Sequence, residues 1–407
     1  MFTQYKSTNF DTFFKLMLEK GIYTRKTNDD KNIILNYIKD KCNFSDPEVR
    51  FSRGLVLDAV TFEPKCVSPM KSMKIANFNQ MVTDWSQVHI TDFVDGTMIN
   101  IWFGGEEWNI STRSVVGAQC HYYSEKSFKE MFEEASEGLD FTKFNPVLTY
   151  SFVLRHPENR IVTSYEKPDL VLVQANWGWN EVNIHQVAEE LKSHGMDIKT
   201  PQVYKFSSLE DILEKIASME YEEQGLVLRF NSTRAKIRNP KYEQAKLLRG
   251  NNRNLFFTYL EHFKNHRVGE YLTYYPEHKV QFDDWFDKIK VMTNKLHACY
   301  VGGFIRHSMD RTEIPYELKP HCYALHNLHK KTGNKVTKKY AIEYFNSLDI
   351  PQIIFIINYD KNKEYYESKA KMTVEATVEA TAEATAELNK EIEEIGKVVS
   401  ETVLSTA

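Results

Sequence analysis

Long apolar runs, paired cysteines and metal-binding spacings are all missing from this chain of 407 residues. No stretch approaches the roughly eighteen consecutive apolar residues of a membrane span, so we expect none. The N-terminus, MFTQYKSTNFDTFF, has no basic head followed by an apolar core, so we expect no secretory signal. The five cysteines are scattered and never spaced as C-x-x-C, which argues against a disulfide framework or structural zinc. The thirteen histidines include no H-E-x-x-H spacing, so no metal site is expected.

Net charge is also small, at −4, and its distribution is uneven. Residues 371–407 carry eight glutamates against three lysines, which leaves the rest of the chain close to neutral. Within that body one short span is strongly basic and is opposed only by Glu243. Its members are Arg229, Arg234, Lys236, Arg238, Lys241, Lys246, Arg249 and Arg253. Such a stripe suits contact with phosphates, although a solvated charged face is the more common explanation.

Apolar content is high enough, at 42%, for one large core or two. Residues 1–250 alternate between strand-like and helix-like patterns, without a regular strand–helix repeat. Strands are expected at 53–60, 147–153, 169–175 and 225–238, with a hairpin over 97–113 that turns at Gly104-Gly105. Helices are expected near 124–136, 183–194 and 207–219, the last beginning after Ser207 or Ser208. This order predicts an α+β fold with antiparallel sheets.

The remainder of the chain changes character twice. Residues 251–367 read as a separate helical domain, with long helical patterns at 282–301 and 337–348. Residues 368–407 form a tail rich in alanine, glutamate and threonine. Within 374–403 an apolar stripe favours a docking or self-associating helix, about equally with a frayed acidic tail, because threonine lowers helix propensity. Its members are Val374, Val378, Ala382, Ala386, Leu388, Ile392, Ile395 and Val399.

A possible catalytic motif lies at FVDG, residues 93–96. Covalent nucleotidyltransferases carry K-x-D-G here, and the neutral lysine amine attacks the α-phosphate of ATP. In this chain Asp95 and Gly96 are in place, but the lysine position is Phe93. No local shift supplies the missing amine, because there is no lysine between Lys74 and Lys126.

The surrounding motifs, taken in order over residues 30–360, resemble the T-even phage RNA ligases of the tRNA-repair type. The similar segments are RGLVLDAVTFEPKCVSPMKSMKIANF (53–78), STRS (111–114), YSFVLRHPENRIVTSY (150–165), EQGLVLRF (223–230) and AKIRNPKY (235–242). The resemblance implies a nucleotidyltransferase (ATP-grasp-like ligase) domain followed by a helical C-terminal domain. It also implies that a nucleotide or phosphate would be bound by Arg53, Lys74, Asp95, Gly96, Arg160, Lys236 and Arg238.

The departures from this family fall on its chemistry. Besides Phe93, a serine, Ser151, replaces the glutamate of the F-E-F strand, and Gln224 replaces that of the E-G-x-V strand. If Glu223 shifted by one position to fill that place, it would point to the opposite face of the strand. Neutral side chains bind a divalent metal far more weakly than carboxylates do. The sequence therefore predicts no catalytic residues and no metal site.

Three hypotheses follow. The first is a phage pseudoligase that acts by binding, in the host cytoplasm or within the virion, since the resembled family is also linked to tail-fibre attachment. The second is an active ATP-dependent RNA ligase that uses a displaced lysine such as Lys74 or Lys71, with ATP and Mg²⁺. The third is a module that binds RNA, such as tRNA. A protein partner or self-association through 374–403 is expected, and no membrane partner.

Overall fold

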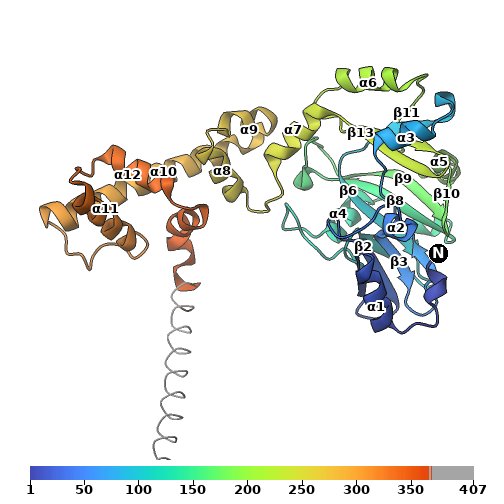
Figure 1. Ribbon diagram of the computed structural model, residues 1–407, viewed down its shortest axis with the longest axis horizontal. Helices are drawn as coiled ribbons and strands as arrows, with labels where there is room; N and C mark the ends of the chain where they lie inside the picture. Colours follow the sequence, from blue (N-terminus) through green and yellow to red (C-terminus); the bar gives the residue numbers. More distant parts are fainter. Residues whose placement is uncertain (366–367, 369–407) are drawn as a thin grey trace, which may run out of the picture. The chain divides into compact units, whose positions relative to one another are not determined.

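The computed structural model describes residues 1–365 and residue 368. The chain divides into two compact units, Met1–Asn254 and Leu255–Ala407. The tail segment 374–403, for which a docking helix is expected, lies outside the described residues. Each unit is described by itself below (Figure 1).

The first unit contains three sheets in which every pairing between the described strands is antiparallel, as the sequence predicted. One sheet has the order β1-β2-β3-β4. Its strands are β1 (Ile22–Lys26), β2 (Asn32–Tyr37), β3 (Arg53–Asp58) and β4 (Pro64–Cys66). Helices α1 (Phe10–Glu19) and α2 (Pro47–Phe51) belong to this part of the unit, and a core that includes Phe13 and Leu55 lies beneath them.

The second sheet has the order β10-β9-β8-β6-β7. Its strands are β6 (Thr97–Phe103), β7 (Trp108–Thr112), β8 (Leu148–Arg155), β9 (Asp169–Trp177) and β10 (Asn180–Val182). Helices α4 (Phe128–Ala135) and α5 (Ile184–Ser193) bury Met131 and Leu191 against one face of this sheet. On β8 and β9, a separate cluster of buried valines, Val153, Val171 and Val173, packs with Val94 and Met98.

The third sheet has the order β11-β5-β12-β13. Its strands are β5 (His89–Asp92), β11 (Val203–Tyr204), β12 (Gly225–Phe230) and β13 (Thr233–Arg238). Helices α3 (Ile75–Met81) and α6 (Leu209–Ser218) supply Phe78 and Ile212 to its core. Ser208 caps α6 by accepting a hydrogen bond from the Asp211 amide. Helix α7 (Pro240–Arg249) follows β13 directly, with Pro240 in its first turn.

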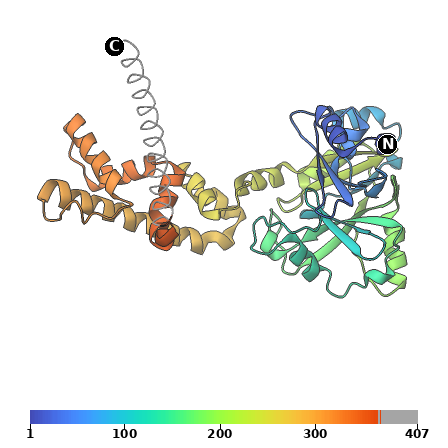
Figure 2. The same ribbon diagram turned by 90° about the horizontal axis from the view of Figure 1, so that it is seen from below.

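The described part of the second unit contains only helices (Figures 1 and 2). They are α8 (Leu255–Lys264), α9 (Val268–Tyr274), α10 (Lys279–Tyr300), α11 (Lys319–Thr332) and α12 (Lys338–Ser347), and residues 350–365 are also helical. Large aromatics fill its interior, for example Tyr259, whose ring centroid lies 4.9 Å from that of Phe282. Within the described residues, no helix is both long enough and apolar enough to cross a bilayer.

Candidate nucleotide and phosphate site

The register of the third sheet places Phe93 beside Lys236. Phe93 continues β5, and its amide donates to the Gly225 carbonyl at 2.8 Å. On β13, Lys236 pairs with Val227, which in turn pairs with Thr91 of β5, so the three side chains share one face. The Lys236 Nζ therefore lies 4.1 Å from the centroid of the Phe93 ring.

The environment of Lys236 is strongly cationic. Burial is the main cause that lowers its pKa to about 6, and the charges of Arg234, Arg53, Arg238 and Lys71 lower it further. At neutral pH most of the amine is then uncharged, so its contact with Phe93 is mainly van der Waals packing rather than a cation–π interaction. We call Arg53, Lys71, Arg234, Lys236 and Arg238 the cation cluster.

One arginine of this cluster, Arg53, lines a cavity. The Arg53 guanidinium donates to the Pro69 carbonyl at 3.2 Å, and burial lowers its pKa. The cavity measures about 430 Å³, and Arg25, Lys39 and Arg113 also line it. No carboxylate belongs to that lining, so the cavity suits an anion.

The space beside Phe93 is closed. A cavity of about 30 Å³ remains there, bordered by Phe93, Val94, Met98, Val153 and Val227, among others. That volume holds about one water, whereas small-molecule sites measure about 300–1,000 Å³. In this conformation the position adjacent to Phe93 therefore has no room for a nucleoside.

The two positions that match the glutamates of the family carry neutral groups within hydrogen-bonded strands. Ser151 on β8 is buried and donates to Oδ1 of Asn100, its cross-strand partner, at 2.8 Å. Gln224 is also buried. Glu223 is exposed, and its carboxylate accepts from the Glu220 amide at 2.9 Å. Glu223 therefore does not replace the missing carboxylate at position 224.

Asp95 and Gly96, which were expected to bind nucleotide, have structural roles. Asp95 is 5% exposed, and its carboxylate accepts hydrogen bonds from the amides of Val162 and Thr163 and from the Tyr242 hydroxyl at 2.6 Å. Gly96 has φ +140°, and an added Cβ would lie 2.4 Å from the Leu154 carbonyl oxygen. The turn thus ties β8 and α7 to β5, and it offers no carboxylate oxygen that is free of these bonds.

The remaining expected binding residues do not all converge. Lys74 is exposed at the N-cap of α3, and it is absent from the residues that perturb Lys236. Arg160 Nε donates to the Val162 carbonyl at 2.8 Å, which supports the same loop as Asp95. Arg238 is paired with Glu243 at 2.9 Å. Lys71 instead enters the cation cluster, where burial and Arg53 lower its pKa.

Sequence reasoning placed Arg234 in the basic stripe but did not single it out as a site residue. Its period-two spacing with Lys236 and Arg238 on β13 was the available signal, because alternate residues of a strand share a face. The cavity-lining residues Gln174 and Asn176 carried no comparable signal. Among the described residues, no group of three or more His, Cys, Asp or Glu side chains could hold a metal ion.

Comparison with known proteins finds no matching family model. The chain is 24% identical over 234 residues to a protein of Autographa californica nuclear polyhedrosis virus that is provisionally named a bifunctional polynucleotide kinase/RNA ligase. The match covers 52% of this chain and only 33% of the viral protein. Together with the ordered motifs, this similarity points to the RNA ligase and nucleotidyltransferase superfamily.

Among solved structures, an archaeal ATP-dependent RNA ligase matches with a TM-score of 0.43 and 14% identity, over 69% of this chain and 72% of that one. A Naegleria gruberi RNA ligase with pyrophosphate matches with a TM-score of 0.35 and 14% identity, over 44% and 57%. Both TM-scores lie below 0.5.

Proposed function

We propose that the chain is a pseudoligase of the T-even phage RNA ligase type, which binds nucleotide or RNA phosphates but forms no covalent adenylate. One observation supports this above all. The Phe93 ring stands where the family has its nucleophile, packed against Lys236 and beside a space of about 30 Å³. Ser151 and Gln224 deprive the same site of two carboxylates that a metal would need.

The binding half of the proposal rests on the cation cluster. Cations that lie close together repel one another, and an anion that enters the cluster relieves this repulsion. The neighbouring cavity of about 430 Å³, lined by Arg25, Lys39, Arg53 and Arg113, extends the positive surface. RNA, including tRNA-like ends, is the proposed ligand, because its backbone presents successive phosphates.

Intact-mass spectrometry after incubation with ATP and Mg²⁺ tests the loss of covalent chemistry. A ligase lysine attacks the α-phosphorus, forms an N–P bond and releases pyrophosphate. We expect the mass of this chain to stay unchanged. An added adenylate would contradict the pseudoligase proposal.

A second candidate function, an active ATP-dependent RNA ligase with a displaced nucleophile, is favoured by Lys236 itself. Its amine adjoins the position of the missing lysine, and its pKa of about 6 leaves it mostly neutral at pH 7. Lys74, by contrast, is exposed at the N-cap of α3. In this alternative, Lys236 Nζ bonds to the α-phosphorus of ATP, the bond to pyrophosphate breaks, and the amine proton passes to solvent, with Mg²⁺ as the required co-reactant. Peptide mapping of an adenylate to Lys236, and its loss in Lys236→Met, would establish this activity.

Phosphate binding by the cluster is tested through its salt dependence. For a single-stranded RNA, log K falls with log salt by about 0.7 for each phosphate contact. We expect Lys71→Gln to weaken binding and to reduce this slope by about 0.7, because Lys71 belongs to the cluster. Lys74→Gln removes the same charge from an exposed site outside it, and should leave the slope unchanged. Equal effects of both substitutions would argue against the cluster.

A role in assembly is a further part of the proposal, and it comes from the sequence alone. Residues 374–403 would dock on a partner protein, on a second copy of the chain or on the virion, for example where tail fibres attach. The protein would act in the host cytoplasm before any incorporation into particles. Truncation at residue 370 should then remove self-association or co-sedimentation with particles.

A further inference from the structure

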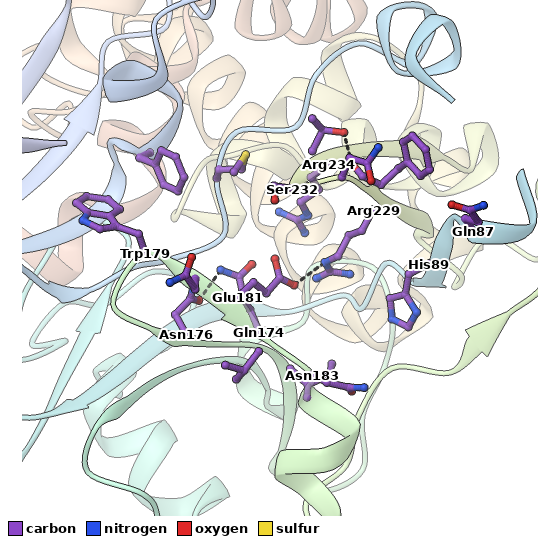
Figure 3. A pocket seen from close by; sticks show the side chains of 18 residues that line it. Gln87, His89, Gln174, Asn176, Trp179, Glu181, Asn183, Arg229, Ser232 and Arg234 are labelled. Carbon is purple, nitrogen blue, oxygen red and sulfur yellow. Dashed lines mark hydrogen bonds and ion pairs between the residues drawn. The ribbon is translucent and has the colours of Figure 1, made fainter. Parts of the chain in front are cut away.

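A larger cavity, of about 510 Å³, lies between the second and third sheets (Figure 3). We call it the distal cavity. It is lined by β9 and β10 on one side and by the β12–β13 hairpin on the other. His89 lies at its edge, four residues before Phe93. At about 3.3 Å per residue of strand, His89 and Phe93 are roughly 13 Å apart.

The charges that line the distal cavity are not balanced. Arg229 and Arg234 are cross-strand partners, so their side chains lie together. Glu181 pairs with Arg229 at 2.9 Å, as the dashed line in Figure 3 shows. Arg234 is only 8% exposed, its Nε has no hydrogen-bond partner, and it makes no ion pair within the described residues. The carboxylate nearest to Arg234, that of Glu181, is already paired with Arg229, so burial of the Arg234 charge is costly and an anion in the cavity would offset that cost.

The other lining groups suit the nucleoside part of a nucleotide. Gln174 and Asn176 are almost fully buried, and Gln174 Nε2 donates to Asn176 Oδ1 at 2.8 Å. That bond leaves the Gln174 carbonyl oxygen as an acceptor and the Asn176 amide nitrogen as a donor, a pair that complements the edge of a base. Trp179 and Phe51, whose ring centroids are 5.5 Å apart, supply aromatic surface at the end where Trp179 stands in Figure 3.

We propose that the distal cavity binds a nucleoside monophosphate without metal and without a covalent bond, with the phosphate on Arg234 and the base against Gln174 and Asn176. The nucleotide is either free or the 5′-terminal nucleotide of an RNA strand, since both present the same chemistry. The cavity volume lies within the usual range for small-molecule sites. Arg229 and Arg234 also border the small cavity beside Phe93, and Arg234 belongs to the cation cluster, so this inference rests on the proposed binding function and names its ligand.

Charge favours a monophosphate over a triphosphate. The two arginines and Glu181 leave the lining with one net positive charge, and burial and Arg229 lower the pKa of His89, which keeps that side chain neutral. A triphosphate would bring about four negative charges into this lining. The described residues offer no cluster of metal ligands that could carry the excess.

Equilibrium dialysis of the full chain in EDTA tests the proposal, with AMP, ATP, adenosine and inorganic phosphate as probes. We expect AMP to bind most tightly, and both ATP and adenosine at least tenfold more weakly. Arg234→Gln should weaken AMP binding at least tenfold without lowering the melting temperature, because it removes an unpaired buried charge. Arg267→Gln, the same change at an exposed arginine of the second unit, should have no effect.

A second variant separates the base from the phosphate. Gln174→Leu should weaken AMP binding while leaving the binding of inorganic phosphate unchanged. Competition by RNA with a 5′-phosphate, but not by the same RNA with a 5′-hydroxyl, would identify an RNA end as the source. A free mononucleotide is the source if neither strand competes. Failure of AMP to bind, a requirement for Mg²⁺, or an Arg234→Gln variant that binds AMP normally would overturn the proposal. None of these results bears on self-adenylylation, which is measured separately.

Discussion

Asp95 offers the sharpest test of whether a retained motif residue serves the fold or the chemistry. Its buried carboxylate accepts from the amides of Val162 and Thr163 and from the Tyr242 hydroxyl. Asp95→Ala would remove the acceptor of these three hydrogen bonds. Each hydrogen bond to a charged group contributes about 1.5–3 kcal/mol, and such bonds are not additive. We therefore expect a loss of about 3–5 kcal/mol in the free energy of unfolding.

Urea unfolding followed by tryptophan fluorescence measures this loss in the first unit, because Trp285 is the one tryptophan of the six that lies outside it. At about 2–4 °C per kcal/mol for a unit of this size, the melting temperature should fall by at least about 6 °C. Tyr242→Phe is the matched control. It removes one of the three hydrogen bonds and keeps the buried ring, so it should cost only about 1–2 kcal/mol.

The opposite pattern would refute this reasoning. If Asp95→Ala unfolded at the urea concentration of the wild type but lost nucleotide or RNA binding, the carboxylate would be a ligand-binding group rather than a structural one.

The other predictions concern chemistry, pH and assembly. Phe93→Lys alone should not restore RNA ligation in a nick- or end-joining assay. Only its combination with Ser151→Glu and Gln224→Glu could restore ligation, because catalytic groups act as a unit. Strong ligation by the single variant would contradict this prediction. Between about pH 6 and 10 the Lys236 amine is mostly neutral in the folded chain and mostly protonated in the unfolded chain. Because the unfolded state then binds more protons, the free energy of unfolding should rise with pH over that window. Lys236→Met should therefore be more stable than the wild type at pH 6, with a difference in urea midpoint that shrinks toward pH 10. Deletion of 371–407 should leave the melting temperature of the body unchanged while it abolishes oligomerisation measured by light scattering; persistent association would remove the support for a docking tail.

Local patterns predicted much of the fold because their causes are local. The hairpin over 97–113 follows from two alternating runs around Gly104-Gly105, and it appears as β6 and β7. Helix α6 begins where Ser208 provides its cap. Short edge strands such as β10 and β11 were not predicted, because two or three residues are too few to show an alternation of apolar and polar side chains. The three-sheet arrangement was not predicted either, because it depends on pairings such as that of β5 with β12, which lies more than 130 residues later.

The site was less predictable than the fold, for the same physical reason. Because side chains alternate between the two faces of a strand, the sequence predicted that Arg234 and Lys236 share one face of β13. It did not predict which residues contact that face. Lys71 lies 165 residues and Arg53 183 residues before Lys236, and only the tertiary fold brings their charges near it. Counting along a motif selected Lys74 instead of Lys71. The backbone places Lys74 at the exposed N-cap of α3.

The retained and the lost motif residues differ in what the fold requires of them. Gly225 has φ +129°, and a Cβ there would lie 2.2 Å from the Ile237 carbonyl oxygen, so no other residue fits without movement. Asn159 donates to the Thr97 hydroxyl at 2.9 Å, and Asp95 holds the same loop. A lysine at position 93 would have no such structural partner. It would add a further buried amine beside Lys236, at a cost in stability. Under the pseudoligase proposal no catalysis would offset that cost, and Phe93 instead packs an apolar ring against Lys236.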